Sequence, residues 1–299
     1  MNYLKLIHKT AFNCLLLFST ASILHAQDVL PQQSTARPFG LDIVGPVYRA
    51  GSDADSASFQ ANDLPVLHSF LTTTLGELVT LDNLASSALD SSQLYLNTAS
   101  DVRVYFVGEA AAHKNTLGFS TEGIGLTEGV VGLTEGNPQL IFPDNSTRRR
   151  NFLNGDQPNN WRSDALPLLP GDFVDLGSFD AGTQLDFFLI GDGADDGEHI
   201  FTAHNDVNLD GIQHMVAFAV EGSPFLLIGF EDIYRGGDRD YNDALFAVDI
   251  GAQNVTYLAN PEPSTWLILL SFIGFIAWTK YRNTIVSETV ESNPSPLGL

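Results

Sequence analysis

From residue 102 onward, short apolar runs alternate with turn residues, and this pattern restricts the fold more than any other feature of the chain. Within the runs apolar and polar side chains alternate, and Gly, Pro, Asn or Asp bounds each run, which is typical of β-strands. The predicted strands are residues 102–107, 139–142, 172–176, 183–190, 213–220, 224–230 and 244–250. Because no helical pattern separates them, they predict an all-β domain, an antiparallel β-sandwich or jelly roll. Alternate residues should form its core, for example Leu185, Phe187 and Leu189, or Phe225, Leu227 and Phe246.

A helical pattern precedes the strands. From Leu64 onward apolar residues recur three or four positions apart, after Asn62 and Asp63 as candidate caps and with Pro65 in the first turn. This spacing predicts a short N-terminal helical region whose buried face carries Leu67, Leu71, Leu75 and Leu78.

Residues 231–243, between the last two predicted strands, carry acidic and amide side chains on both sides of a Gly-Gly turn. After the turn, Asp238, Asp240 and Asn242 alternate, so their side chains project to one side of an extended backbone. The two acids before the turn can fold back across the glycines. Carboxylates held so close repel one another unless a cation or an arginine lies between them, and calcium accepts about six to eight oxygen ligands. The stretch therefore predicts calcium ligands at Asp238, Asp240, Asn242, Asp243, Glu231 and Asp232. The alternative is a metal-free turn in which Arg235 and Arg239 pair with the carboxylates.

A second polar stretch fits the opening of a calcium loop, with Asp206, Asn208 and Asp210 before a glycine. The full helix-loop-helix motif fails, because its twelfth position is Ala217 and the following residues alternate like a strand. Two alternatives stay open. Either these residues share an ion with the 231–243 stretch, or they form a hairpin rich in Asp and Asn without metal.

No recognisable catalytic motif is found. His199, His204 and His214 lack zinc-ligand spacing and are expected at the surface or at strand ends. G-x-S-x-G, P-loop and dinucleotide-binding patterns are absent from the sequence. Cys14, the only cysteine, lies in the N-terminal apolar run, so the mature domain is expected to have neither a disulfide nor a cysteine nucleophile. We therefore expect no enzymatic activity; a glycoside hydrolase that uses a pair of acids is an alternative.

The formal net charge of −22 disfavours nucleic acid and anionic membrane surfaces as partners and favours cations. Solubility outside the cell is the simpler explanation for much of this charge. Export itself is predicted by the N-terminus, where Lys5 and Lys9 precede an apolar run, residues 11–24. This is typical of a secretory signal peptide, with cleavage after Ala26.

The C-terminal region has a polar motif, an apolar run and a basic stop. Pro261, Glu262 and Pro263 precede the apolar residues 267–278, and Lys280 and Arg282 follow them. The run rises only about 20 Å as a helix, which is shorter than a hydrocarbon core of roughly 30 Å and typical of a transient membrane anchor. This order resembles the PEP-CTERM sorting signal of Gram-negative bacteria, which implies processing by a membrane-embedded exosortase. The tail, residues 283–299, is longer than in that pattern, and a retained single-span anchor is the alternative.

The acidic stretch also carries a family resemblance. F-E-D, a Gly-rich turn and D-R-D-Y-N-D-A-L-F resemble the signature of domain of unknown function 4114, a family found in exported bacterial proteins. Residues 104–109, 138–143, 169–172 and 208–214 are similar to it as well. The resemblance implies no reaction, because the family has none assigned.

These patterns predict the organisation of the chain. It comprises a signal peptide (1–26), a leader with the helical part (27–100), a DUF4114-like β-sandwich (101–252), a sorting signal with one transmembrane helix (261–282) and a polar tail (283–299). We expect export across the inner membrane and display at the cell surface or in the extracellular matrix, as a calcium-binding structural or binding module. The first alternative is a carbohydrate-binding module that contacts extracellular polysaccharide through Tyr234, Tyr241 or Trp161.

Overall fold

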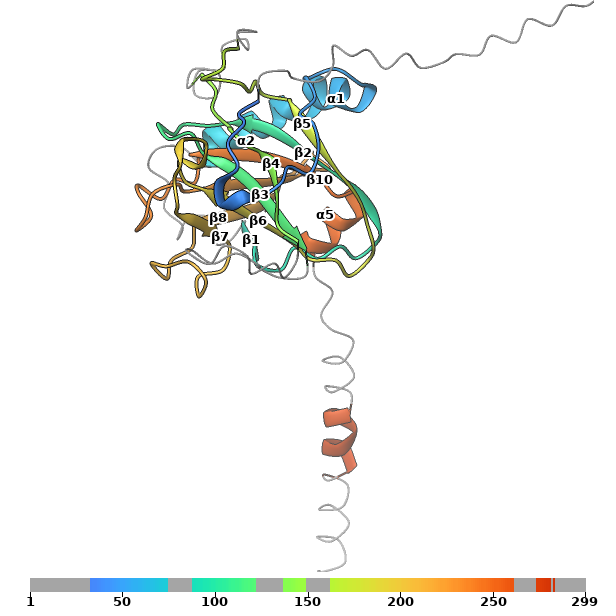
Figure 1. Ribbon diagram of the computed structural model, residues 1–299. Coiled ribbons are helices and arrows are strands. Elements are labelled where there is room, and N and C mark those ends of the chain that lie inside the picture. Colours follow the sequence, from blue (N-terminus) through green and yellow to red (C-terminus); the bar gives the residue numbers. More distant parts are fainter. Residues whose placement is uncertain are drawn as a thin grey trace, which may run out of the picture.

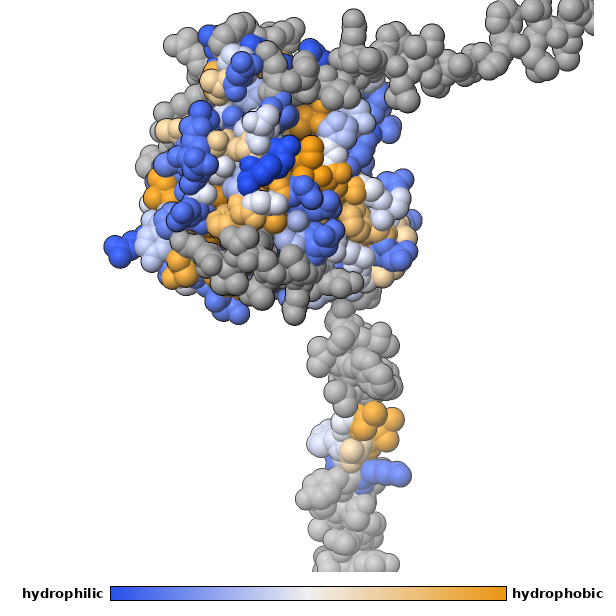
Figure 2. All heavy atoms as spheres, in the orientation of Figure 1, coloured by the Kyte–Doolittle hydropathy of each residue, from blue (hydrophilic) through white to orange (hydrophobic). Residues whose placement is uncertain are grey.

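A computed structural model of the chain describes residues 33–74, 88–121, 137–148, 162–260, 273–280 and 282 (Figure 1). The predicted signal peptide and the motif at residues 261–263 lie outside this part. Residues 273–280 are helical, and Ile273, Phe275, Ile276 and Trp278 are about half exposed. Figure 2 shows hydrophobic side chains on the surface of this helix. In the described part of the chain, no helix is both long enough and apolar enough to cross a membrane.

The described strands form two antiparallel sheets, which confirms the predicted all-β class (Figure 1). The first sheet contains, in spatial order, β1 (Ala88–Leu89), β8 (Met215–Ala219), β9 (Leu226–Phe230), β10 (Ala244–Asp249), β2 (Ser100–Gly108) and β5 (Phe173–Phe179). The second contains β4 (Gln139–Phe142), β3 (Thr116–Thr121), β6 (Leu185–Ile190) and β7 (Ile200–Thr202). Every predicted strand is present.

One hydrophobic core lies between the two sheets and holds them face to face. It includes Phe106 and Phe246 from the first sheet and Phe142 from the second. The rings of Phe142 and Phe246 stack with centroids 5.8 Å apart. Leu185, Phe187 and Leu189 also lie in this core, as their alternation predicts.

A helical layer covers the outer face of the first sheet. It runs through α1 (Ala54–Ser58), the π-helical turn η2 (Phe59–Asp63) and α2 (Leu64–Thr74). Leu67 and Leu71 are fully buried, as predicted, and Phe59 stacks on Tyr105 at 4.0 Å. Leu75 and Leu78 lie outside the described residues.

The α-helix α2 begins at Leu64, as the spacing predicts, but Asn62 and Asp63 do not cap it. Asn62 and Asp63 lie inside the helical segment, which begins at Ala54, where the Asp53 side chain accepts a hydrogen bond from the Ser56 N–H. Asp53 satisfies one of the backbone donors that a helix N-terminus leaves open, so the true cap lies nine positions earlier than the first candidate.

The helical layer also corrects the predicted core. Phe225 and Leu227 pack under the helices, whereas Phe246 faces the second sheet, so the three residues do not share one core. Since Phe39 and Leu41 cover the outer face of the second sheet, both sheets are buried on both sides. All five residues of β9 are consequently buried. The alternation of side chains along the strand therefore does not tell which of them face the helices and which face the second sheet.

Strand β3 was not predicted, although it lies between β4 and β6. Its sequence, T-L-G-F-S-T, contains glycine and hydroxyl residues that are also typical of loops. The structure explains the glycine: a Cβ atom at Gly118 would lie 2.3 Å from the ring of Phe188. Strand β7, the helix α5 (Ala252–Ala259) and the 3-10 turns η1 (Pro38–Gly40) and η3 (Gly193–Asp195) were not predicted either.

Candidate metal centre

The acidic stretch is the loop between β9 and β10, two neighbouring strands of the first sheet. Pairing continues one step past the strands, because Asp243 N donates to Phe230 O at 3.1 Å and Glu231 N donates to His214 O at 2.9 Å. The first and last acids of the loop are therefore fixed by the sheet. Residues 233–239 between them, most of which are exposed, form a surface turn.

Several residues of the loop have positive φ angles, which residues other than glycine rarely adopt. Arg235, Arg239 and Tyr241 have φ angles of 71°, 60° and 56°, and two glycines between them are also positive. Each such non-glycine residue costs about 1–3 kcal/mol and persists only where surrounding contacts hold it. A Cβ atom at Gly237 would lie 2.7 Å from Glu231 Oε2, so glycine allows the turn to pass directly over that carboxyl.

Three carboxylates converge beneath this turn. Glu231, Asp238 and Asp240 each offer an oxygen, and these atoms lie within 4.8 Å of one another. Glu231 is fully buried: its Oε1 accepts a hydrogen bond from Tyr241 N at 2.9 Å, and its Oε2 has no partner in the described residues. Burial raises the pKa of Glu231 to about 7, and the charges of Asp240 and Asp238 add to this effect. The fold therefore places the carboxylates of Asp238 and Asp240 next to Glu231 Oε2, an oxygen without a hydrogen-bond partner in the described residues.

The predicted ligand set is divided between two sides of the loop. Asn242 stays with the first cluster, since its backbone N–H and its amide both donate to Asp240. Asp232 and Asp243 form a separate pair: Asp232 N donates to Asp243 Oδ2 at 3.0 Å, and the two carboxyls hydrogen-bond each other. Burial, followed by the charge of Asp232, raises the pKa of Asp243 to about 8. One ion does not account for all six predicted side chains in this geometry.

The arginines of the loop form no ion pair with its acids in the described part of the chain. Arg235 lies over the ring of Tyr234, 5.6 Å from its centroid, and its backbone N–H donates to Asp210 Oδ2 at 2.6 Å. The metal-free turn neutralised by arginine is therefore not the arrangement observed.

The loop belongs to the part of the chain that resembles other proteins. Residues 179–251 match the family model described as Domain of unknown function (DUF4114). Comparisons with curated proteins and with solved structures found no match to the chain. The DUF4114 segment runs from the end of β5 through β10 and contains both acidic loops. The stretches at 104–109, 138–143 and 169–172 lie outside the matched residues.

The second acidic loop of the DUF4114 segment has a different arrangement. The Asn208 amide is fully used: its oxygen accepts from Thr202 N and Oγ1, and its nitrogen donates to Thr202 O and Ile212 O. Asp206 is exposed. Asp210 accepts hydrogen bonds from His214 and from the backbone of Arg235, and these contacts hold its pKa below the usual range against the opposing effect of burial. Asp210 thus joins the two loops, and the structure does not bring these three residues together as a ligand cluster.

The histidines are more buried than expected. His214 is fully buried, donates from Nε2 to Asp210 Oδ2 at 2.9 Å, and stacks on Phe201. His204 is half-buried and contacts Asp186 at 3.2 Å, which raises its pKa. His199, stacked on Tyr234, is exposed. His199 and His214 directly precede β7 and β8, so both lie at strand ends as predicted. No histidine belongs to a metal-type cluster in the described residues.

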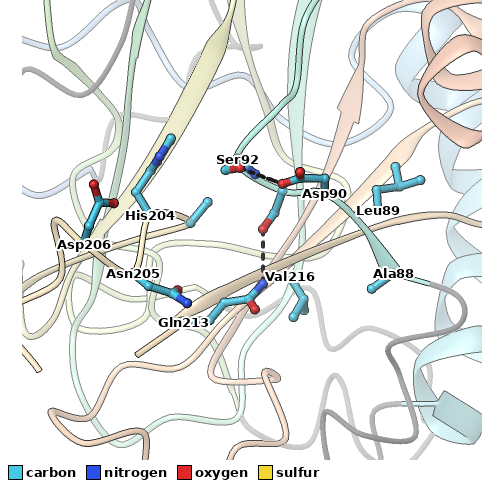
Figure 3. A pocket seen from close by; sticks show the side chains of 11 residues that line it. Ala88, Leu89, Asp90, Ser92, His204, Asn205, Asp206, Gln213 and Val216 are labelled. Atoms are coloured by element: carbon cyan, nitrogen blue, oxygen red, sulfur yellow. Dashed lines mark hydrogen bonds between the residues drawn. The ribbon is translucent and has the colours of Figure 1, made fainter. Parts of the chain in front are cut away.

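A cavity of about 590 Å³ opens at the edge of the sandwich, beside β1 and β8 (Figure 3). Its polar lining includes Asp90, Ser92, His204, Asp206 and Gln213, and the Gln213 amide donates to Ser91 Oγ at 3.3 Å. No Phe, Tyr or Trp side chain is among the described residues that line it. It offers mainly hydrogen-bonding groups.

Sequence reasoning missed several polar residues near the loop. Glu109, which follows β2, and Asn115 and Asn145, which flank strands of the second sheet, are all at most 4% exposed. An acid directly after an apolar strand is the signal that could have singled out Glu109. The two asparagines gave no such signal, because asparagine is common in turns.

Proposed function

We propose that the chain is an exported, non-enzymatic module of the cell surface or extracellular matrix whose β-sandwich is stabilised by calcium at Glu231, Asp238 and Asp240. The Glu231 carboxyl carries this proposal, because its second oxygen is buried, unpartnered and adjacent to two further carboxylates. A buried charge without a partner is costly, and a cation among the three oxygens removes that cost. Carboxylate oxygens are the ligands that calcium prefers.

The strained turn supports the same proposal. Positive φ angles at Arg235, Arg239 and Tyr241 need compensating contacts. A cation held between Glu231 at the base of the loop and Asp238 at its tip supplies such a contact. The exposure of Asp238 leaves a side of the cluster open to solvent, through which an ion can enter.

The observations favour this role over the two alternatives. Tyr241 is fully buried and is closed to a sugar, and the Tyr234 ring, although 39% exposed, stacks on His199 and lies near the Arg235 guanidinium. Trp161 lies outside the described residues. A glycoside hydrolase needs two acids on opposite sides of a sugar, whereas Glu231 is fully buried beneath its own loop.

Calcium titrated into the metal-free mature chain is expected to bind saturably in a calorimeter. Asp238→Asn combined with Asp240→Asn should weaken this binding by about tenfold or more, because calcium affinity follows the number of charged ligands. Asp180→Asn, at an exposed position outside the loop, makes the same chemical change and should bind like the wild type. Unchanged affinity in the double variant would contradict the proposed site.

Export and processing are tested by the mass of the chain recovered from its host. We expect a mature N-terminus at Gln27 and removal of the apolar residues 267–278 by an exosortase-type enzyme. An intact mass that includes these residues would instead indicate a retained anchor, and a mass that includes residues 1–26 would contradict export through the signal peptide.

A further inference from the structure

The cavity beside β1 and β8 lies where the edges of the two sheets meet. β1 is the outermost strand of the first sheet, and β7 is the outermost strand of the second. Residues 88–92, from β1 and the turn after it, line one side of the cavity, and residues 203–206, which directly follow β7, line the other. Figure 3 shows these two segments on either side of the opening, with Gln213 between them. The volume of about 590 Å³ lies within the range of about 300–1,000 Å³ that is usual for small-molecule sites.

Hydrogen bonds within the fold hold two polar side chains of this lining in place. Asp90 Oδ1 accepts from the backbone N–H of Ser92 at 3.1 Å and from its hydroxyl at 2.6 Å. The Gln213 amide nitrogen donates to Ser91 Oγ at 3.3 Å and to Met215 O at 2.8 Å. Side chains that are already fixed lose little conformational freedom when a ligand binds, which favours binding.

His204 is fixed by a buried carboxylate that does not itself line the cavity. Its Nε2 donates to Asp186 Oδ1 at 3.2 Å, and Gln184 Nε2 donates to the same oxygen at 2.6 Å. Asp186 is only 5% exposed. Since a carboxylate accepts hydrogen bonds and does not donate them, this contact determines that Nε2 carries a proton. The imidazole therefore has one orientation at the wall of the cavity.

The groups that remain for a ligand are mostly hydrogen-bond acceptors. Asp90 Oδ2, Gln213 Oε1 and both oxygens of Asp206 make no hydrogen bond to the residues that the structure describes. The Asn205 amide is equally open within these residues and supplies donors as well. A ligand rich in hydroxyl groups matches this lining, because each hydroxyl donates one hydrogen bond and accepts others.

The rest of the lining is aliphatic and comes from Ala88, Leu89, Ala203 and Val216. A pyranose ring has hydroxyl groups along its rim and C–H groups on its faces, so it contacts both kinds of surface at once. A nucleobase or another aromatic ligand has no stacking partner here, since no Phe, Tyr or Trp of the described residues lines the cavity.

We propose that this cavity binds a neutral sugar unit of an extracellular polysaccharide. The side chains that bind its hydroxyl groups are Asp90, His204, Asn205, Asp206 and Gln213. The carboxylates in this set select against uronates and phosphates, because like charges held close together repel each other. The proposal goes beyond the calcium-stabilised module, since none of the three proposed calcium ligands lines the cavity.

Chemical-shift mapping by NMR on the isotope-labelled mature chain tests the proposal. Glucose, galactose and mannose are titrated at millimolar concentrations, and each is compared with its uronate. At least one neutral sugar is expected to shift the amide signals of residues 88–92, 203–206 and 213 saturably. Its uronate, which adds a negative charge, should bind more weakly by about tenfold or more.

The double variant Asn205→Ala/Asp206→Ala removes two of the proposed binding side chains without touching the core. Both residues are exposed, and neither side chain makes a hydrogen bond to the described residues, so the variant should fold like the wild type. Its affinity for the neutral sugar should fall by about tenfold or more, because it loses one charged and one neutral hydrogen-bonding group. Asp180→Ala, at an exposed position away from the cavity, should bind like the wild type.

Several results would overturn the proposal. It fails if none of the neutral sugars binds, if the shifted signals lie outside the cavity, or if a sugar and its uronate bind equally well. Wild-type affinity in the Asn205/Asp206 double variant would also contradict it. These outcomes do not depend on the calcium titration, so the sugar site and the calcium site can each fail alone.

Discussion

Removal of calcium is expected to lower the melting temperature of the mature chain by about 5–10 °C. A ligand that binds only the native state stabilises it by about 2.7 kcal/mol when its concentration is a hundred times its dissociation constant. For a domain of this size each kcal/mol corresponds to roughly 2–4 °C. The site exists only in the folded chain, because the pairing of β9 with β10 brings Glu231 beneath the turn. Differential scanning calorimetry in calcium and in chelator measures the shift.

The double variant Asp238→Asn/Asp240→Asn should melt at the same temperature in calcium and in chelator if the site at Glu231 supplies the stabilisation. A shift of wild-type size in the double variant would mean that calcium stabilises the chain at some other place. Magnesium is the ionic control, since it prefers a smaller octahedral site. Equal melting temperatures for the wild type with and without calcium would argue against a stabilising ion at this site.

The calcium effect should also grow with pH. Without metal the pKa of Glu231 is raised to about 7 by burial, whereas unfolded carboxyls titrate near pH 4. Between these limits the native state binds more protons than the unfolded state, so the stability of the metal-free chain falls as the pH rises. Calcium replaces the protons, and the shift it causes should be larger at pH 8 than at pH 5. A shift that is constant over this range would contradict the raised pKa of Glu231.

Asp172→Ala is expected to destabilise the sandwich by about 3–5 kcal/mol, the usual cost of removing one partner of a buried ion pair. Asp172 is fully buried and its two oxygens are saturated. Both pair with the Arg162 guanidinium, and they also accept hydrogen bonds from Ala50 N at 2.9 Å and Leu169 N at 2.7 Å. The variant leaves a charge and two backbone donors without a partner. Urea denaturation monitored by fluorescence measures the loss.

Asp175→Ala is the matched control, three positions along the same segment. Asp175 also pairs with an arginine, Arg103, but its side chain is 48% exposed. Exposed pairs contribute about 0–1 kcal/mol, so this variant should lose little stability. If both variants lost the same free energy of unfolding, burial would not determine how much an ion pair stabilises this fold.

The sequence predicted the strands and the helical region because their signals are local. Alternation and turn residues marked the longer apolar runs, such as those of β6 and β10. They did not mark β3, where close packing against Phe188 requires Gly118. Likewise, burial of β9 was readable from its composition, whereas the division between Leu227 under the helices and Phe246 between the sheets was not.

For the candidate site, the sequence by itself determined the polar loop between two strands and most of its acids. The tertiary structure decided which acids meet, since Glu231 and Asp232 are neighbours in the chain but have different partners. Only the pairing of β10 with β2 brings Glu109 to the loop, and only the packing of the second sheet brings Asn145 near it. The physical reason is that hydrophobic period and turn chemistry report on each residue's own surroundings. The convergence of side chains from distant strands depends on sheet register and on the contact between sheets, which no single stretch of sequence records.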